Sequence, residues 1–422
     1  MMRNGLSVAM LALFSFGSAG ASAQVCDPLV DSMRIAAETA PEVSVAQARV
    51  QRAEADLAEA RSLRRPQLST FGRSGVGDTG LTTNQNDNQV GLRLSQRVFD
   101  FGDARLAIDS AEYQRERLAF DQASAEAQAA YALGSAYLAA QEARGRMAVI
   151  AERRDYYARQ LESVDALLVR GGATRAERAQ IAAQLAEADA VMLELRSQEE
   201  RAGARLEAYL GRPAGVCGDA DTAAELTDRL ADLQTADQAL DAVMAANPRM
   251  DATRSNIRSL EAQRERQRRS RLPVVDVVGI SSYTYDDIRE DWDYRDRIGV
   301  DVSVPILTGN ALGARSDRAD AVLEEEEYAL RQLQRDLREQ GGVVFRRLLS
   351  LRAQQVQREA VAASQREYFE AIAGEFEFGL GTLPDLVEAR LDYERAMLDL
   401  VAVEFELKRQ QLDLMLLTSR LP

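Results

Sequence analysis

The sequence contains no histidine, only two cysteines and a single lysine, Lys408, among its 422 residues. Without histidine, the chain lacks the most common general base and the most common ligand of zinc and copper. A hydrolase of the Gly-x-Ser-x-Gly type, which needs a histidine base, is excluded for the same reason. We therefore expect no enzymatic activity, no cofactor and no metal site. The net charge of −15 also argues against nucleic acid as a partner, because nucleic-acid binding requires a basic surface.

Long apolar runs are also missing, since no stretch after the N-terminus has the roughly 20 apolar residues of a membrane helix. Residues 1–23 have the three parts of a secretory signal peptide: Arg3, the apolar run from Leu6 to Phe16, and Ala21-Ser22-Ala23. The alternative is a buried N-terminal helix. We expect an exported protein that starts near Gln24 and that can enter a membrane only as strands.

The expected export of the chain bears on the redox state of its two cysteines. In an oxidising compartment an even pair such as Cys26 and Cys217 usually forms a disulfide. The alternative is a lipid attached to Cys26, but the preceding Ala23-Gln24-Val25 does not resemble a lipoprotein cleavage box. We favour the disulfide.

The chain reads as a duplication, because landmarks recur at a nearly constant offset. The offset is 207 residues at two prolines (248 − 41 and 273 − 66) and 208 at later positions (379 − 171 and 382 − 174). The matched pairs are Pro41 and Pro248, Pro66 and Pro273, Gly171 and Gly379, and Thr174 and Thr382. We predict a first repeat over residues 24–217 and a second over residues 218–422.

Each repeat is predicted to contain a helix, a β-hairpin and a long helical hairpin. The β-hairpins span residues 67–99 and 274–306, and the helical hairpins span residues 103–210 and 311–418. A helix of about 65 residues is roughly 100 Å long, which no compact domain needs. Such helices persist by packing side by side as coiled-coil hairpins with glycine turns at their tips.

The β-hairpins have one apolar and one polar face. Ile298, Val300, Val302, Val304 and Ile306 alternate with small or polar residues, over the length that a tilted strand needs to cross a bilayer. The alternative is a water-facing sheet on a soluble core. Four strands cannot close a barrel, and open sheet edges are not tolerated in lipid. Strands in a membrane would therefore have to be pooled from several chains.

Over essentially the whole mature sequence, the chain resembles the TolC-type outer membrane efflux and secretion channel family. The resemblance lies in the order, twice over, of Ala36–Pro41 and Val243–Pro248, of the strand-to-helix passages Arg97–Gly102 and Pro305–Asn310, and of the turn Phe378–Ala389. It implies a homotrimer whose chains contribute four strands each to one small membrane β-barrel, above a long α-helical coiled-coil barrel. Such a protein lies in the outer membrane with a large periplasmic portion.

The resemblance also implies a function and partners. The channel would carry efflux or type I secretion substrates from a periplasmic membrane-fusion adaptor and an inner-membrane pump, either an ABC or a proton-driven transporter. Outer membrane lipid would surround the strands. The alternative is a periplasmic coiled-coil adaptor or scaffold protein of an export system.

Several site residues follow from the resemblance. Asp385 and Glu388 match the two acidic positions that ring the family's aperture, and their spacing puts both on one helix face. The alternative role is compensation of a helix dipole. Glu177 occupies the matching position in the first copy. Phe376 stands in place of a family tyrosine and Gly381 in place of a basic residue. These two differences remove a hydroxyl and a cation from the polar contacts that hold the aperture closed in the family.

The helical tips are the expected adaptor-binding sites. The residues concerned are Gly171, Gly172, Thr174, Gly379, Gly381 and Thr382. Glycine permits a tight turn and leaves the backbone accessible. The alternative is that these residues only end the helices.

Overall fold

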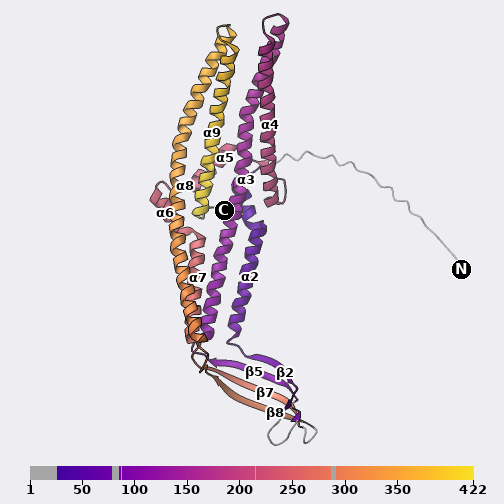
Figure 1. Ribbon diagram of the computed structural model, residues 1–422, viewed down its shortest axis with the longest axis vertical. Coiled ribbons are helices and arrows are strands. Elements are labelled where there is room, and N and C mark those ends of the chain that lie inside the picture. The colour runs from indigo at the N-terminus through magenta and orange to yellow at the C-terminus, as the bar shows by residue number, and fades with distance from the viewer. Residues whose placement is uncertain (1–25, 78–84, 87, 214, 287–290) are drawn as a thin grey trace, which may run out of the picture.

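The computed structural model describes residues 26–77, 85–86, 88–213, 215–286 and 291–422, so the predicted signal peptide lies outside the described residues. The molecule is elongated, with long helices that end in two tips and a sheet at the opposite end (Figure 1). The predicted fold class, mainly helical with four strands in a small sheet, is confirmed. No described helix has the length and apolar character needed to cross a membrane.

Two helices of 67 residues each run along most of the molecule. At 1.5 Å per residue, each is about 100 Å long. The described helices are α1 Leu29–Thr39, α2 Pro41–Ser62, α3 Asp103–Val169, α4 Arg175–Leu210, α5 Asp219–Arg229, α6 Ala236–Ala246, α7 Pro248–Arg269, α8 Ala311–Glu377 and α9 Leu383–Leu417.

The helices predicted before the β-hairpins are α2 and α7, which begin at Pro41 and Pro248, and a shorter helix that was not predicted, α1 or α6, precedes each of them. α1 and α2 are separated at Ala40, and α6 and α7 at Asn247, where the backbone is extended. A proline follows each break, and proline disfavours the helical conformation of the residue before it. The first helices begin 207 residues apart (236 − 29) and the long helices 208 residues apart (311 − 103), whereas α5 has no counterpart among the residues of the first half that the structure describes.

The main sheet is antiparallel and has the order β2-β5-β7-β8. Its strands are β2 Gln67–Arg73, β5 Gln89–Phe99, β7 Val274–Asp286 and β8 Asp291–Ser303. The strand predicted to reach Ile306 ends at Ser303, because Pro305 has no N–H to donate to a ladder. The short strands β1 Cys26–Asp27 and β6 Gly215–Val216 pair with each other, as do β3 Val76–Gly77 and β4 Gln85–Asn86.

The register separates the side chains of the main sheet by character. Val277 lies opposite Val300 and Gly279 opposite Ile298, whereas on the other face Ile280 lies opposite Arg297. The first face is apolar and exposed in the single chain, with Ile298 86% exposed. It also carries the aromatic pairs Tyr283 with Tyr294 and Tyr285 with Trp292, close to the ends of the strands that lie farthest from the helices.

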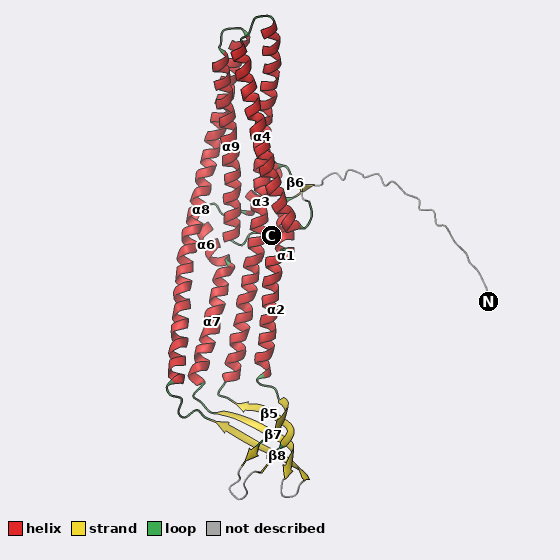
Figure 2. Cartoon of the chain, turned by 45° about the vertical axis from the view of Figure 1, so that its right-hand side comes forward, coloured by secondary structure: helices red, strands yellow, loops and turns green. Residues whose placement is uncertain are grey.

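The helical hairpins α3/α4 and α8/α9 lie side by side and contact each other through α3 and α9 (Figure 2). Halfway along the molecule, α1 and α5 add apolar side chains to a common core with these helices. This core includes Leu29, Met33, Leu133, Tyr137, Leu226, Leu412 and Met415.

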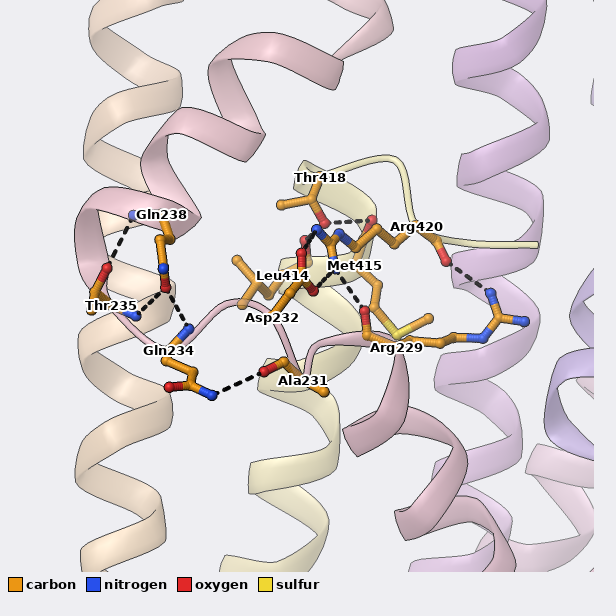
Figure 3. A network of polar contacts seen from close by, with 10 residues as sticks. All are labelled: Arg229, Ala231, Asp232, Gln234, Thr235, Gln238, Leu414, Met415, Thr418 and Arg420. Carbon is orange, nitrogen blue, oxygen red and sulfur yellow. Dashed lines mark hydrogen bonds and ion pairs between the residues drawn. The ribbon is translucent and has the colours of Figure 1, made fainter.

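Hydrogen bonds and an ion pair join the C-terminal end to the connection between α5 and α6 (Figure 3). Arg420 Nη2 lies 2.6 Å from Asp232 Oδ2, and Arg420 Nη1 donates to the carbonyl oxygen of Arg229 at 2.8 Å. Arg229 Nη1 donates in return to the carbonyl oxygen of Arg420 at 3.1 Å. The ion pair lowers the pKa of Asp232 and raises that of Arg420. These contacts keep α5 and α6 against the long helices.

The predicted cysteine pairing falls partly within the described residues. Cys217 takes part in a disulfide, and parallel pairing places the backbone of Cys26 opposite Gly215. Tyr137 joins the two segments, because its hydroxyl donates to the carbonyl oxygen of Asp27 at 2.9 Å and accepts from the N–H of Cys217 at 2.7 Å. The side chain of Cys26 lies outside the described part, so its bond to Cys217 stays a prediction.

Candidate functional site

The tip between α3 and α4, called the first tip, turns at Gly171, whose φ of +74° is one that glycine adopts without strain. The N–H of Gly172 donates to the carbonyl oxygen of Leu167 at 2.9 Å and satisfies the end of α3. Thr174 then caps α4 in a capping box: its Oγ1 accepts from the N–H of Glu177 at 3.2 Å, and Glu177 Oε2 accepts from the N–H of Thr174 at 2.7 Å.

The tip between α8 and α9, called the second tip, has the same plan. Gly379 turns with a φ of +73°, and the N–H of Leu380 donates to the carbonyl oxygen of Glu375 at 2.9 Å. Thr382 Oγ1 donates to Asp385 Oδ2 at 2.6 Å and accepts weakly from its N–H at 3.4 Å. A β-carbon on Gly381 would lie 3.2 Å from the backbone nitrogen of Phe376, so this glycine permits a close backbone approach.

Of the predicted aperture carboxylates, two are engaged in helix caps and one is free. Glu177 and Asp385 occupy equivalent third positions of their helices and bond to Thr174 and Thr382. Hydrogen bonds from Thr174 lower the pKa of Glu177, and the backbone N–H has a larger effect than the hydroxyl. Glu388 is exposed and has no hydrogen bond or ion pair with any described residue. Glu177 and Asp385 therefore stabilise the starts of their helices, in line with the helix-dipole role given as the alternative for Asp385, whereas Glu388 has no such contact.

Phe376 does not project freely from the second tip. It is half-buried and packs against a cluster of buried side chains to which both helical hairpins contribute. The most exposed large apolar side chains at the tips are Val169 on the first, and Phe378 and Leu380 on the second, at 89%, 83% and 80%. These residues, which the sequence prediction did not single out, give each tip an apolar surface beside its glycine turn.

One apolar core joins the two tips, and we call it the tip core. Its buried members come from all four long helices: Tyr157, Val164, Ile181, Phe369, Leu383, Leu386, Val387, Ala389 and Tyr393. Because these side chains interlock across α3, α4, α8 and α9, the tips are packed together within a single chain.

A buried ion pair crosses between the hairpins beside the tip core. Arg153 Nη1 on α3 donates to Glu394 Oε1 on α9 at 3.0 Å, and both side chains are 7% exposed. Arg153 Nη2 also donates to Gln184 Oε1 on α4 at 2.9 Å. Burial raises the pKa of Glu394, an effect that the attraction of Arg153 opposes. Removing either partner would leave an uncompensated charge in the interior.

Arg390 lies in an aromatic cage next to this ion pair. Its guanidinium carbon is 5.2 Å from the ring centroid of Tyr156, 5.1 Å from that of Phe369 and 5.3 Å from that of Tyr393. Such distances are typical of cation–π attraction, which strengthens on desolvation. Burial raises the pKa of Tyr156 to about 12, so its hydroxyl stays protonated.

Sequence reasoning missed Arg153, Arg390 and Glu394, because charged residues on long helices are usually solvated. A signal existed in the four-residue spacing of Arg390 and Glu394, which puts both on the helix face that carries Leu383, Leu386 and Val387. Their partners lie far away in the sequence: Arg153 and Glu394 are 241 residues apart. Within the described ranges, no three or more acidic, cysteine or histidine residues are grouped so as to hold a metal ion.

Comparisons with known proteins agree with this architecture. The family model described as outer membrane efflux protein matches residues 33–212 and 225–420. The outer membrane efflux protein BepC of Brucella suis is 26% identical over 360 residues, which cover 83% of this chain and 76% of that protein. The crystal structure of VceC from Vibrio cholerae matches with a TM-score of 0.77 at 16% identity, over 92% of this chain and 95% of that one.

The CmeC outer membrane channel of Campylobacter jejuni is similar to the same degree, with a TM-score of 0.76 at 15% identity over 93% of this chain and 85% of that chain. The structural likeness concerns the fold, whereas the family model covers both helical hairpins and all four strands of the main sheet. The chain belongs to the outer membrane efflux protein family.

Proposed function

We propose that three copies of this chain form a channel-tunnel that carries efflux or type I secretion substrates across the periplasm and the outer membrane. The main support for the proposal is the structure of the sheet, which has one apolar and one polar face. Two of its strands, β5 and β8, lead into helices about 100 Å long. Family membership supports an efflux channel in the outer membrane. A soluble adaptor or scaffold would not need an exposed apolar sheet face.

The proposed number of copies accounts for the open edges of the sheet. β2 and β8 are the edge strands, and neither has a second neighbour among the described strands. In lipid, unpaired backbone groups cost several kcal/mol each, so the edges must be covered. If β8 of one copy pairs with β2 of the next, three copies make a closed barrel of twelve strands, with the apolar face toward lipid and the polar face inward.

The tips are the proposed aperture and the site of partner binding. Asp385 and Glu388 are exposed on the first turns of α9, so three copies would bring six carboxylates together. Such a ring attracts cations and resists anions. Glu177 on α4 would add its charge nearby. The aperture of this protein would be held closed by the packing of Phe376 against the tip core, rather than by polar contacts of a hydroxyl and a cation.

The proposed partner at the tips is a periplasmic adaptor, which would connect the channel to an inner-membrane ABC or proton-driven pump. Exposed apolar side chains of Val169, Phe378 and Leu380 lie beside glycine turns there. This combination offers apolar area together with accessible backbone groups, as a docking surface requires. Thr174 and Thr382 hold the turns in shape through their caps.

The location and the number of copies are tested by fractionation and by mass. The mature protein should be recovered with outer membranes, and its detergent-solubilised form should have the mass of three chains by native mass spectrometry. Recovery as a soluble monomer after gentle lysis would contradict the proposal.

The aperture is tested by ion selectivity in planar bilayers. Replacing Asp385→Ala together with Glu388→Ala should lower the permeability of K⁺ relative to Cl⁻, because the carboxylate ring is lost. Glu162→Ala removes an exposed carboxylate from α3 and serves as the control. Unchanged selectivity in the double variant would mean that these carboxylates do not line the constriction.

A further inference from the structure

The polar face of the main sheet is rich in arginine, although the chain as a whole has a net charge of −15. The strand register puts five arginines and four aspartates on this face among the residues whose side chains are described. They are Arg73, Arg93, Arg97, Arg295 and Arg297, with Asp276, Asp291, Asp293 and Asp301. The positive and negative charges of this face nearly balance in number, so its local charge depends on how they are distributed along the strands.

The charges form rows across the strands, and the row nearest the helices is neutralised. There Arg97 lies opposite Asp276, which lies opposite Asp301. Arg97 Nε is 3.5 Å from Asp276 Oδ1, and Arg97 Nη1 is 3.8 Å from Asp103 Oδ2. The positive charge of Arg97 is thus balanced by neighbouring carboxylates.

A row farther along the strands contains only positive charge. It runs from Ser69 through Arg93 and Ile280 to Arg297, as the pairs Ser69–Arg93, Arg93–Ile280 and Ile280–Arg297 show. Arg93 and Arg297 are both exposed, and neither side chain has a hydrogen bond or ion pair with any described residue. Since neighbouring strands are about 4.8 Å apart, the two arginines stand about 10 Å from each other across the sheet.

We propose that Arg93 and Arg297 form an arginine belt inside the barrel, which favours the passage of anionic solutes at the outer-membrane end. The inference rests on the proposed function, because the polar face lines a lumen only if copies of the sheet close a barrel. Three copies bring six guanidinium groups to one level of that lumen. A ring of arginine attracts anions, and solutes with a carboxylate or phosphate group would be drawn into the exit.

The belt gives the channel opposite charges at its two ends. The carboxylates of Asp385 and Glu388 lie at the second tip, and Arg93 and Arg297 lie at the far end of the molecule, in the sheet (Figure 1). A solute with both an anionic and a cationic group interacts favourably at each end. We therefore expect zwitterionic and anionic cargo to pass the exit more readily than purely cationic cargo.

The test is the reversal potential in planar bilayers under a KCl gradient. The double variant Arg93→Gln, Arg297→Gln should shift the reversal potential toward the K⁺ equilibrium potential, because fewer anions enter the exit. The matched control, Arg61→Gln with Arg64→Gln, removes two exposed arginines at the end of α2 and should leave the potential unchanged. Arg93→Lys with Arg297→Lys keeps the charge and should retain the original potential.

A second measurement uses the unaltered protein, so it does not depend on folding of the variants. Inorganic triphosphate should reduce the K⁺ current when added on the side of the sheet, and high salt should weaken this block. If the glutamine variants do not change the selectivity, or if triphosphate does not block the current, the arginine belt is contradicted. The proposed function is unaffected by either result. A protein that forms no channel would overturn both.

Discussion

The two helical tips share a backbone plan but differ in what they leave exposed. In the first, the single carboxylate Glu177 is held by both the N–H and the hydroxyl of Thr174. In the second, Asp385 is held by Thr382, and Glu388 on the next turn is free, whereas the equivalent position 208 residues earlier (388 − 208) is the uncharged Gln180. The second tip also exposes two large apolar side chains, Phe378 and Leu380.

This difference separates structural from functional charge. A carboxylate at the third position of a helix stabilises the helix start in either tip, so its presence alone says nothing about transport. A carboxylate without a partner on an exposed turn makes no such contribution. A substitution of Glu388 therefore tests the role of charge at the aperture without also removing a helix cap.

The largest effect is expected where the two tips are joined. Glu394→Ala leaves Arg153 buried without its counter-ion, which costs about 3–5 kcal/mol. Hydrogen exchange of the backbone should show loss of protection in both tips, because the ion pair connects α3 to α9. Glu388→Ala on the same helix is the control and should change protection little. Loosening confined to the second tip would contradict a shared tip core.

A smaller effect is expected at the glycine turns. Alanine at Gly171 or at Gly379 must adopt a positive φ, which costs about 1–2 kcal/mol. Protection of the adjoining helix ends should fall by that amount in hydrogen exchange. Gly172→Ala is the control, since its β-carbon would meet Leu167 Cδ2 at an ordinary 3.5 Å. Equal effects at Gly171 and Gly172 would show that backbone conformation is not the cause.

Loss of a cap should distinguish the two tips. Thr174→Ala is expected to destabilise the start of α4 by about 1 kcal/mol, as measured by hydrogen exchange of its first turn. Thr382→Ala should cost less at the start of α9, because the N–H of Asp385 reaches Thr382 Oγ1 only at 3.4 Å. A larger loss at the second tip would reverse this order and contradict the geometry of the caps.

The smallest effect is a dependence on pH that belongs to the first tip. The cap lowers the pKa of Glu177 from its ordinary value of 4.5, so its stabilisation is complete above pH 4.5 and is lost as the pH falls through the lowered pKa. Exchange at the start of α4 should accelerate over that acidic range. Glu177→Gln should remove this dependence, and an unaltered acid response in the variant would assign it to another group.

Much of the helical framework was predictable from local sequence. The first arm of the helical hairpin expected over residues 103–210 is α3 Asp103–Val169, because a run without strong helix breakers ends at two glycines. The helix expected to end at Leu210 does so, before Gly211 with its φ of +67°. The family resemblance and the location in the outer membrane are also confirmed. The helix ends follow from signals close by in the chain, and the family resemblance follows from the order of such signals along it.

The remaining features depend on contacts between distant segments. The short helices α1 and α6 were not predicted, whereas the helices that follow them were expected to begin at Pro41 and Pro248 and do so. The buried cluster of Arg153, Arg390 and Glu394 was missed because a helix sequence does not tell which charged residue faces a neighbouring hairpin. The aperture, the adaptor contact and the disulfide between Cys26 and Cys217 stay predictions, since all three involve partners or side chains outside the described residues.

The most direct test of the account is cross-linking between the edge strands β2 and β8. The exposed positions Thr70 and Val300 lie on these strands, and Thr70→Cys with Val300→Cys would allow a flexible bis-maleimide to join them in outer membranes. The account predicts linked products of two and three chains and none larger, because three copies close the ring. Cross-links confined to one chain would mean that a single copy closes its own sheet, which would contradict the account.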